Sequence, residues 1–69
     1  MTANDVLDSY LSSLPSSERI AKSRDIRALC HVSTSVLSDW RRKRTPIPRD
    51  FLDKITAAIG ENIFENVAN

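Results

Sequence analysis

The sequence predicts an all-α fold, a compact bundle of about five short helices forming a single domain over residues 1–69. Its apolar residues recur every three or four positions, as on the buried face of a helix. Only one Gly and three Pro interrupt the chain, and no stretch alternates apolar and polar residues as a half-buried strand does. A domain of about this size buries roughly 60% of its unfolded surface, so we expect a small core.

The first helix is expected to begin at Asn4 or Asp5 and to run to Leu14. Asp5 and Asp8 lie near its N-terminus, where negative charge is favourable. Pro15 ends this helix because a proline pushes the residue before it out of the helical conformation. Its apolar stripe comprises Val6, Leu7, Tyr10, Leu11 and Leu14.

The next stretch, residues 15–22, is predicted to be either a polar loop or one short helical turn capped by Ser16 or Ser17. Ser23 is a suitable N-cap for a second helix that reaches Cys30. Residues 31–33 then form a turn. The buried side of this second helix is expected to hold Ile26, Leu29 and Cys30.

Ser33 is the predicted N-cap of the helix around which the chain is organised. Leu37 and Trp40 keep helical apolar spacing, and the pair Pro46 and Pro48 prevents the helix from continuing. The basic run 41–44 is expected to occupy its last turn. Polar residues recur at i, i+3, i+4 and i+7, which places them together on the opposite side of the helix. They are Ser35, Ser38, Asp39 and Arg42, with Thr34 at the N-terminal tip.

A fourth helix is expected to start with Pro48 at its first position and to stop at Gly60, which supplies a left-handed end. Its inward face holds Phe51, Leu52 and Ile55, and Ala58 and Ile59 complete it. Residues 62–68 are predicted to form a short fifth helix, with an extended strand as the alternative.

Charge is unevenly distributed although the formal net charge is only +1. From Arg41 to Arg49 there are five basic residues and no acidic one, whereas the rest of the chain carries five basic and nine acidic residues. Adjacent cations repel one another unless an anion lies close. This segregation therefore indicates a directed anionic partner, and nucleic acid is the partner we expect for the helix that starts at Ser33.

The chain resembles the small helix-turn-helix domains of bacteriophage CI and Cro repressors, the lambda-repressor-like fold. Residues 32–40, ValSerThrSerValLeuSerAspTrp, resemble the turn and recognition helix of that family. Residues 5–8 resemble the start of its first helix, Ile47 and Pro48 its linker into the fourth helix, and Gly60 with Ile63 and Phe64 its closing turn. The chain differs from the family at His31, where glycine is usual, and at Arg27, where a small alanine is usual.

The resemblance implies contacts with double-stranded DNA. Base edges would face Thr34, Ser35, Ser38 and Asp39, and Arg42 is the best candidate for a guanine contact. Asp39 could accept from cytosine or instead pair with Arg42 or Lys43. Phosphates would be met by Ser33, Arg41, Lys43, Arg44 and Arg49.

For the other notable residues, structural roles are favoured over functional ones. Trp40 fits the core better than base stacking, while Val36 could pack or touch a thymine methyl group. Cys30 is expected to be a buried small hydrophobe. One Cys and one His form no zinc cluster, and no nucleophile has an adjacent base, so we expect no cofactor, no metal and no catalysis. The first helix lacks the cations of a membrane-surface helix.

The predicted function is therefore sequence-specific regulation of transcription of the phage repressor type, in which the protein occupies operator DNA and blocks polymerase. A homodimer is expected because two recognition helices read a palindrome, and Ile63, Phe64 and Val67 could form its contact or simply close the core. With no leader or membrane span, we expect a cytoplasmic protein. The alternative is a small helical protein-interaction module, such as an antirepressor or antitoxin, whose polar helix face binds an acidic protein.

Overall fold

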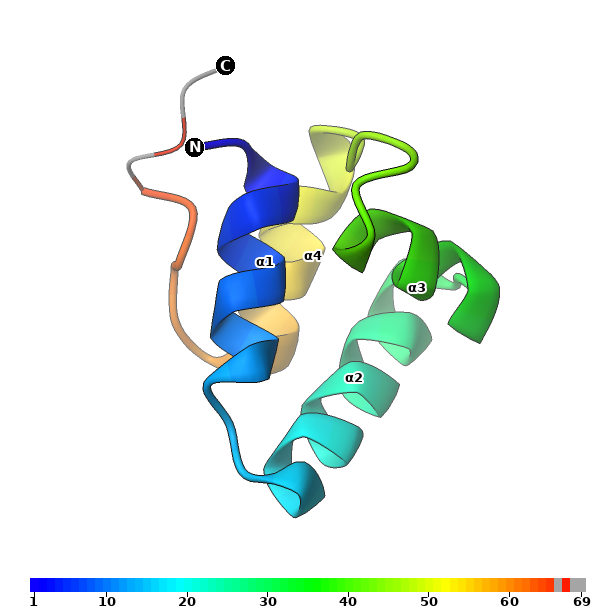
Figure 1. Cartoon of the computed structure of the whole chain (residues 1–69), viewed down its shortest axis with the longest axis vertical. Helices are drawn as coiled ribbons and strands as arrows, with labels where there is room; N and C mark the ends of the chain where they lie inside the picture. Colours follow the sequence, from blue (N-terminus) through cyan, green and yellow to red (C-terminus); the bar gives the residue numbers. More distant parts are fainter. Residues whose placement is uncertain (66, 68–69) are drawn as a thin grey trace.

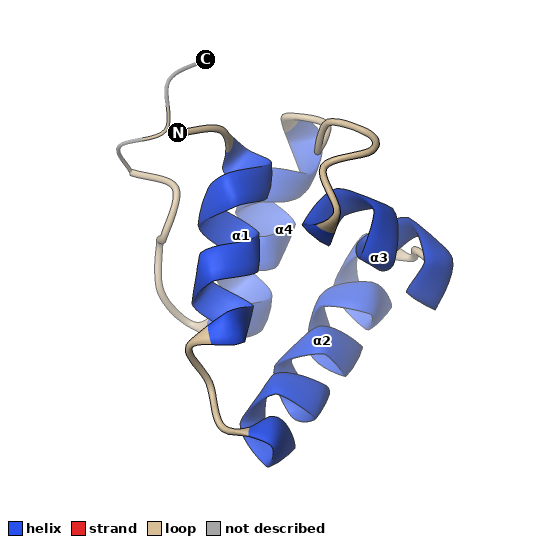
Figure 2. Ribbon diagram, viewed as in Figure 1, coloured by secondary structure: helices blue, strands red, loops and turns tan. Residues whose placement is uncertain are grey.

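A computed structural model describes residues 1–65 and 67, and these residues form four helices and no strand (Figures 1 and 2). The helices are α1 (Ala3–Ser12), α2 (Ser16–Cys30), α3 (Thr34–Arg41) and α4 (Asp50–Ile59). The prediction of an all-helical chain is confirmed. None of the described helices is long and apolar enough to cross a membrane.

α1 begins slightly earlier than predicted because Thr2 and Asp5 form a capping box. The Thr2 hydroxyl accepts from the Asp5 backbone N–H at 3.2 Å, and the Asp5 carboxylate accepts from the Thr2 backbone N–H at 3.0 Å. This reciprocal pair satisfies two N–H groups at the start of the helix. The helix ends at Ser12, two residues before the predicted end at Leu14.

α2 is the largest departure from the prediction, since residues 16–22 form its first half rather than a loop or an isolated turn. Pro15 lies at the N-cap and its carbonyl accepts from the Arg19 N–H at 2.9 Å. A proline is tolerated there because helical N–H groups at that end have no intrahelical partner. The sequence pattern did not indicate this first half as helical because it has no apolar stripe. Its one large apolar residue, Ile20, is 66% exposed.

Leu29 was predicted to be buried, and that prediction is wrong. It is 45% exposed, whereas Ile26 and Cys30 are buried on the same helix. Successive helical residues are about 100° apart around the axis, so Leu29 lies well to one side of Cys30. The buried stripe of α2 is therefore narrower than the sequence pattern indicated.

α4 begins at Asp50 rather than at Pro48. Pro48 instead heads a tight turn, in which its carbonyl accepts from the Phe51 N–H at 3.0 Å. Gly60, with φ of 82°, ends α4 in the left-handed conformation as predicted.

No fifth helix follows α4 in the described residues 61–65 and 67, which form bends and turns. The Asn62 side chain accepts from the Phe64 N–H at 3.0 Å, and such a local bond competes with helix formation. The expected helix or strand over 62–68 is thus absent where the segment is described. Its remaining residues, 66 and 68, lie outside the described part.

The core lies where the four helices meet, with α2 packed most extensively on α4 and α1 in contact with α2 and α3. Trp40 is 2% exposed, and its ring centroid is 5.5 Å from that of Phe51. Phe64, which follows α4 in the chain, is also buried and belongs to this core. The buried apolar residues are Leu7, Leu11, Ile26, Cys30, Leu37, Trp40, Ile47, Ile55, Ile59 and Phe64.

Candidate nucleic-acid interface

Residues 31–33 connect α2 to α3 through an abrupt change of direction. His31 has φ of 56° and ψ of 42°, the left-handed conformation. The Val32 N–H donates to the Arg27 carbonyl at 3.1 Å, which closes the end of α2. Ser33 is extended, and its hydroxyl accepts from the Val36 N–H at 3.2 Å. The predicted N-cap is confirmed.

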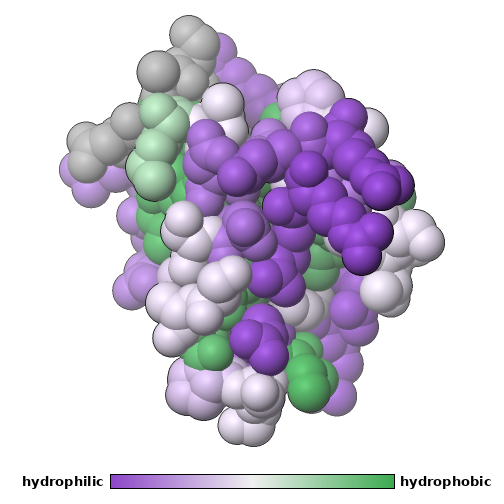
Figure 3. Space-filling view, in the orientation of Figure 1, coloured by the Kyte–Doolittle hydropathy of each residue, from purple (hydrophilic) through white to green (hydrophobic). Residues whose placement is uncertain are grey.

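α3 has one buried and one accessible side. Leu37 is 4% exposed and Trp40 is 2% exposed, so the predicted inward side is confirmed. Val36 is partly buried and packs against the core, which favours its packing role. On the opposite side, Thr34, Ser35 and Arg42 are exposed, and Ser38 and Asp39 are half-buried. Strongly hydrophilic residues gather over α3 and the loop after it in Figure 3.

The basic run was predicted to fill the last turn of this helix, but only Arg41 belongs to α3. Lys43 adopts φ of 62°. Its N–H donates to the Trp40 carbonyl at 3.1 Å, and the Arg44 N–H donates to the Asp39 carbonyl at 2.9 Å. These two bonds are the Schellman pattern of helix ends, with lysine in the position that glycine usually takes. The chain consequently turns away after Arg42.

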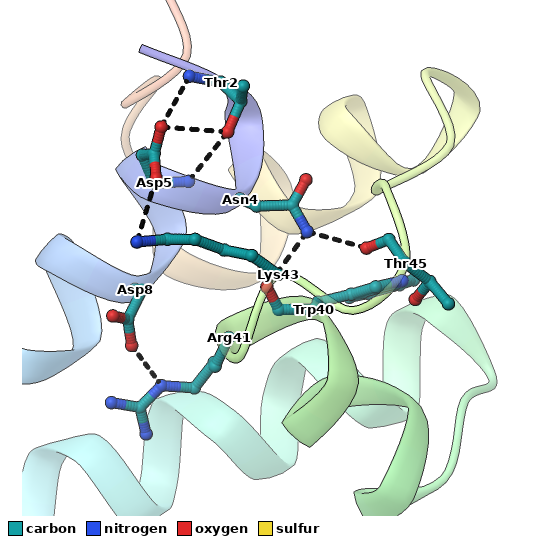
Figure 4. Close-up of polar contacts among 8 residues, drawn as sticks. All are labelled: Thr2, Asn4, Asp5, Asp8, Trp40, Arg41, Lys43 and Thr45. Atoms are coloured by element: carbon teal, nitrogen blue, oxygen red, sulfur yellow. Dashed lines mark hydrogen bonds and ion pairs between the residues drawn. The ribbon is translucent and has the colours of Figure 1, made fainter.

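Asn4 of α1 holds this turn in place (Figure 4). Its side-chain amide donates to the Trp40 carbonyl at 2.9 Å and to the Thr45 carbonyl at 2.8 Å, and its side-chain oxygen accepts from the Ile47 N–H at 3.3 Å. Asn4 is only 6% exposed. Asn4 is not among the predicted functional residues, although its position in register with Leu7 and Leu11 on a buried stripe is a signal in the sequence.

Two ion pairs also tie the end of α3 to α1 (Figure 4). The Arg41 Nε lies 2.9 Å from an Asp8 carboxylate oxygen, and another Arg41 nitrogen donates to the Ser12 hydroxyl at 3.1 Å. The Lys43 Nζ lies 3.0 Å from an Asp5 carboxylate oxygen. Two residues predicted to meet phosphate therefore face α1, and Lys43 pairs with Asp5 rather than with Asp39.

The hydrogen bonds at Asp5 affect its protonation. The backbone N–H of Thr2 and then the ammonium of Lys43 lower the pKa of Asp5 from 3.8 to about 2. The same contact raises the pKa of Lys43. Both groups are thus charged at neutral pH.

Three other residues predicted to contact DNA remain accessible. Arg42, Arg44 and Arg49 are exposed, and none forms an ion pair with any residue among 1–65 and 67. Ser38 and Arg42 also line a shallow polar hollow together with Asp8 and Arg41. Exposed guanidinium and hydroxyl groups can donate several hydrogen bonds to an anionic polymer.

Cys30 and the acidic residues form no alternative centre in the described part of the chain. Cys30 is buried, and burial raises the pKa of its thiol, which disfavours the reactive thiolate. Among the described residues, no three His, Cys, Asp or Glu side chains are grouped so that they could hold a metal ion.

Comparison with protein-family models, with curated proteins and with solved structures gives no match for this chain. A function is therefore inferred from the arrangement and exposure of the side chains of α3 and of the loop after it.

Proposed function

We propose that this chain is a sequence-specific regulator of transcription that binds double-stranded DNA. In this proposal α2 and α3 form a helix-turn-helix of the phage repressor type, and α3 enters the major groove. The observation that carries the proposal is the two-sidedness of α3: Leu37 and Trp40 are buried, while Thr34, Ser35 and Arg42 are exposed. The short turn with left-handed His31 also suits a steep crossing of two helices.

The exposed side chains have different roles in this proposal. Arg42 contacts guanine, and Asp39 accepts from cytosine or orients a neighbouring donor. Phosphates are met mainly by Arg44 and Arg49, which lie after α3. The remaining base-facing residues are Thr34, Ser35 and Ser38, and Ser33 meets phosphate at the start of α3. The regulator binds its operator without a cofactor and catalyses no reaction.

We further propose that two copies bind one palindromic site, with half-sites about 34 Å apart. Phe64 is 8% exposed and belongs to the core of its own chain. A contact between copies through the C-terminal segment must therefore rely on Ile63 and Val67, which are only partly buried.

Selection of bound duplexes from a random pool, followed by salt titration, tests the proposal. Affinity for random duplex should fall by about 0.9 log units per log unit of salt for each phosphate contact. Arg42→Ala should weaken binding to the selected duplex by roughly 1–3 kcal/mol and relax one base position. Arg44→Ala should instead weaken binding to selected and random duplexes alike. Arg24→Ala, at an exposed position of α2, provides a matched control.

Sedimentation of the same complexes should show two chains on one selected duplex. If the wild type binds no duplex with a sequence preference that survives at physiological salt, the DNA-binding proposal is wrong. If Arg42→Ala and Arg44→Ala bind both duplexes as the wild type does, the DNA contacts assigned to these two residues are wrong. Loss of an acidic protein partner in the same two variants would then support the alternative, a protein-interaction module that uses this face.

A further inference from the structure

α1 presents two carboxylates to the basic end of α3. Asp8 lies 2.9 Å from Arg41, and Asp5 lies 3.0 Å from Lys43. Figure 4 shows both cationic side chains extending from α3 and its C-terminal turn towards α1. We call Asp5 and Asp8 the α1 acids.

The α1 acids reduce the charge available to a polyanion. Residues 41–49 carry five cations and no anion, but two of the five have a carboxylate within 3.0 Å. The accessible surplus therefore comes from Arg42, Arg44 and Arg49. A carboxylate near a duplex also repels phosphate directly.

Both pairs can exchange partners because they are partly exposed. The side chains of Arg41 and Asp8 are 31% and 34% exposed, and those of Lys43 and Asp5 are 53% and 32% exposed. A pair of this kind shifts an equilibrium by a factor of about five or less. A phosphate contact has an additional driving force, since it releases condensed counterions from the duplex.

Arg41 also retains free donors in its present position. Its guanidinium has five N–H groups, and the bonds to Asp8 and Ser12 occupy two of its nitrogens. The hollow lined by Asp8, Ser38, Arg41 and Arg42 is open to solvent beside them. A backbone phosphate entering this hollow would compete with Asp8 for the same guanidinium.

We infer that the α1 acids limit the DNA affinity of this chain by holding Arg41 and Lys43 against α1, and that duplex phosphate displaces both carboxylates on binding. This inference rests on the proposed function, since it concerns the same DNA-binding surface. Asp5 and Asp8 then regulate DNA affinity without contacting DNA, because their carboxylates and the DNA phosphates are both negatively charged. Their effect should be equal on all sequences, since phosphates carry no direct sequence information.

The test is Asp8→Asn, which keeps the shape of the side chain and removes its charge. Selected and random duplexes should both be bound roughly two- to fivefold tighter at low salt, with an unchanged ratio between them. The salt dependence should change by less than one phosphate contact, about 0.9 log units per log unit of salt, because Arg41 meets phosphate in both proteins. Asp5→Asn should act in the same way through Lys43 and provides a second, independent variant.

Asp25→Asn is the matched control because it also removes one negative charge, from an exposed residue of α2 that forms no ion pair with any described residue. Its smaller gain measures the general effect of net charge. In an Arg41→Gln background, Asp8→Asn should give no more than this control gain. Circular dichroism at the binding temperature verifies that each variant is folded.

Failure of this inference is distinguishable from failure of the proposed function. If the wild type binds a selected duplex but Asp8→Asn and Asp5→Asn bind no tighter than Asp25→Asn, the α1 acids do not limit DNA affinity and the inference is wrong. Weaker binding by Asp8→Asn would overturn it as well, by showing that the carboxylate orients Arg41 for its contact. If the wild type binds no duplex, both proposals are overturned.

Discussion

At its N-terminal end α3 is held by contacts within its own neighbourhood, whereas its C-terminal end is held by α1. The Ser33 hydroxyl caps the first turn by bonding to Val36, three positions away. At the other end, Asn4 bonds to Trp40, Thr45 and Ile47 across 36 to 43 positions of sequence. Asp8 reaches Arg41 across 33 positions.

The difference separates two tasks within one short helix. The N-terminal end, satisfied locally, leaves Thr34 and Ser35 exposed. The C-terminal end, tied to α1, fixes how α3 is oriented on the rest of the chain. It also places Arg41 and Lys43 beside the carboxylates of α1, so the same contacts that orient the helix limit its charge.

The largest effect is expected from breaking the distant contacts. Asn4→Ala leaves the Thr45 carbonyl and the Ile47 N–H without their hydrogen-bond partner, while the Trp40 carbonyl keeps the Lys43 N–H. An unsatisfied buried polar group costs about 1–3 kcal/mol. We expect a loss of about 2–4 kcal/mol in the free energy of unfolding, measured by urea denaturation. Ser9→Ala, at an exposed position of the same helix, should change stability little.

Asn4→Asp refines this prediction. The carboxylate can still accept from the Ile47 N–H, but it cannot donate to the carbonyls of Trp40 and Thr45. It should therefore be at least as destabilising as Asn4→Ala at neutral pH. Two variants as stable as the wild type would show that Asn4 does not hold the end of α3.

The same contrast explains what the sequence could and could not predict. The cap at Ser33, the inward side of Leu37 and Trp40, and the stop at Gly60 follow from spacing and from local backbone preferences, and the structure confirms them. The early start of α2 was not predicted, because its first half buries too few apolar side chains to show a helical pattern.

The contacts of α1 with the end of α3 were equally beyond local reasoning. Nothing near Asn4 in the sequence indicates carbonyls more than thirty positions away. Asp5 and Asp8 were expected only to favour the start of a helix, and their pairing with Lys43 and Arg41 depends on how α1 packs on α3. The candidate surface was thus predictable, but the groups that neutralise part of it were not.

A smaller effect is expected at the locally held end. Ser33→Ala removes the acceptor of the Val36 N–H, and the loss of an N-cap costs about 1 kcal/mol. Ser35→Ala is the matched control because it makes the same chemical change within α3, where alanine is a favourable residue. Equal stability of the two variants in urea would show that the cap does not contribute.

The smallest effect concerns the pH dependence of the pair between α1 and Lys43. The pKa of Asp5 is about 2 in the folded chain and ordinarily 3.8. A carboxyl group whose pKa is lower in the folded state stabilises that state above the ordinary value, and loses this contribution as pH falls towards the folded value. Wild type should therefore be more stable than Asp5→Asn at neutral pH, and the difference should shrink between pH 3.8 and about 2.

Urea unfolding at a series of pH values measures this difference in stability, and Asp25→Asn controls for the loss of one negative charge. A difference that stays constant down to about pH 2 would contradict the assignment, since it would then arise from something other than ionised Asp5 held by Thr2 and Lys43.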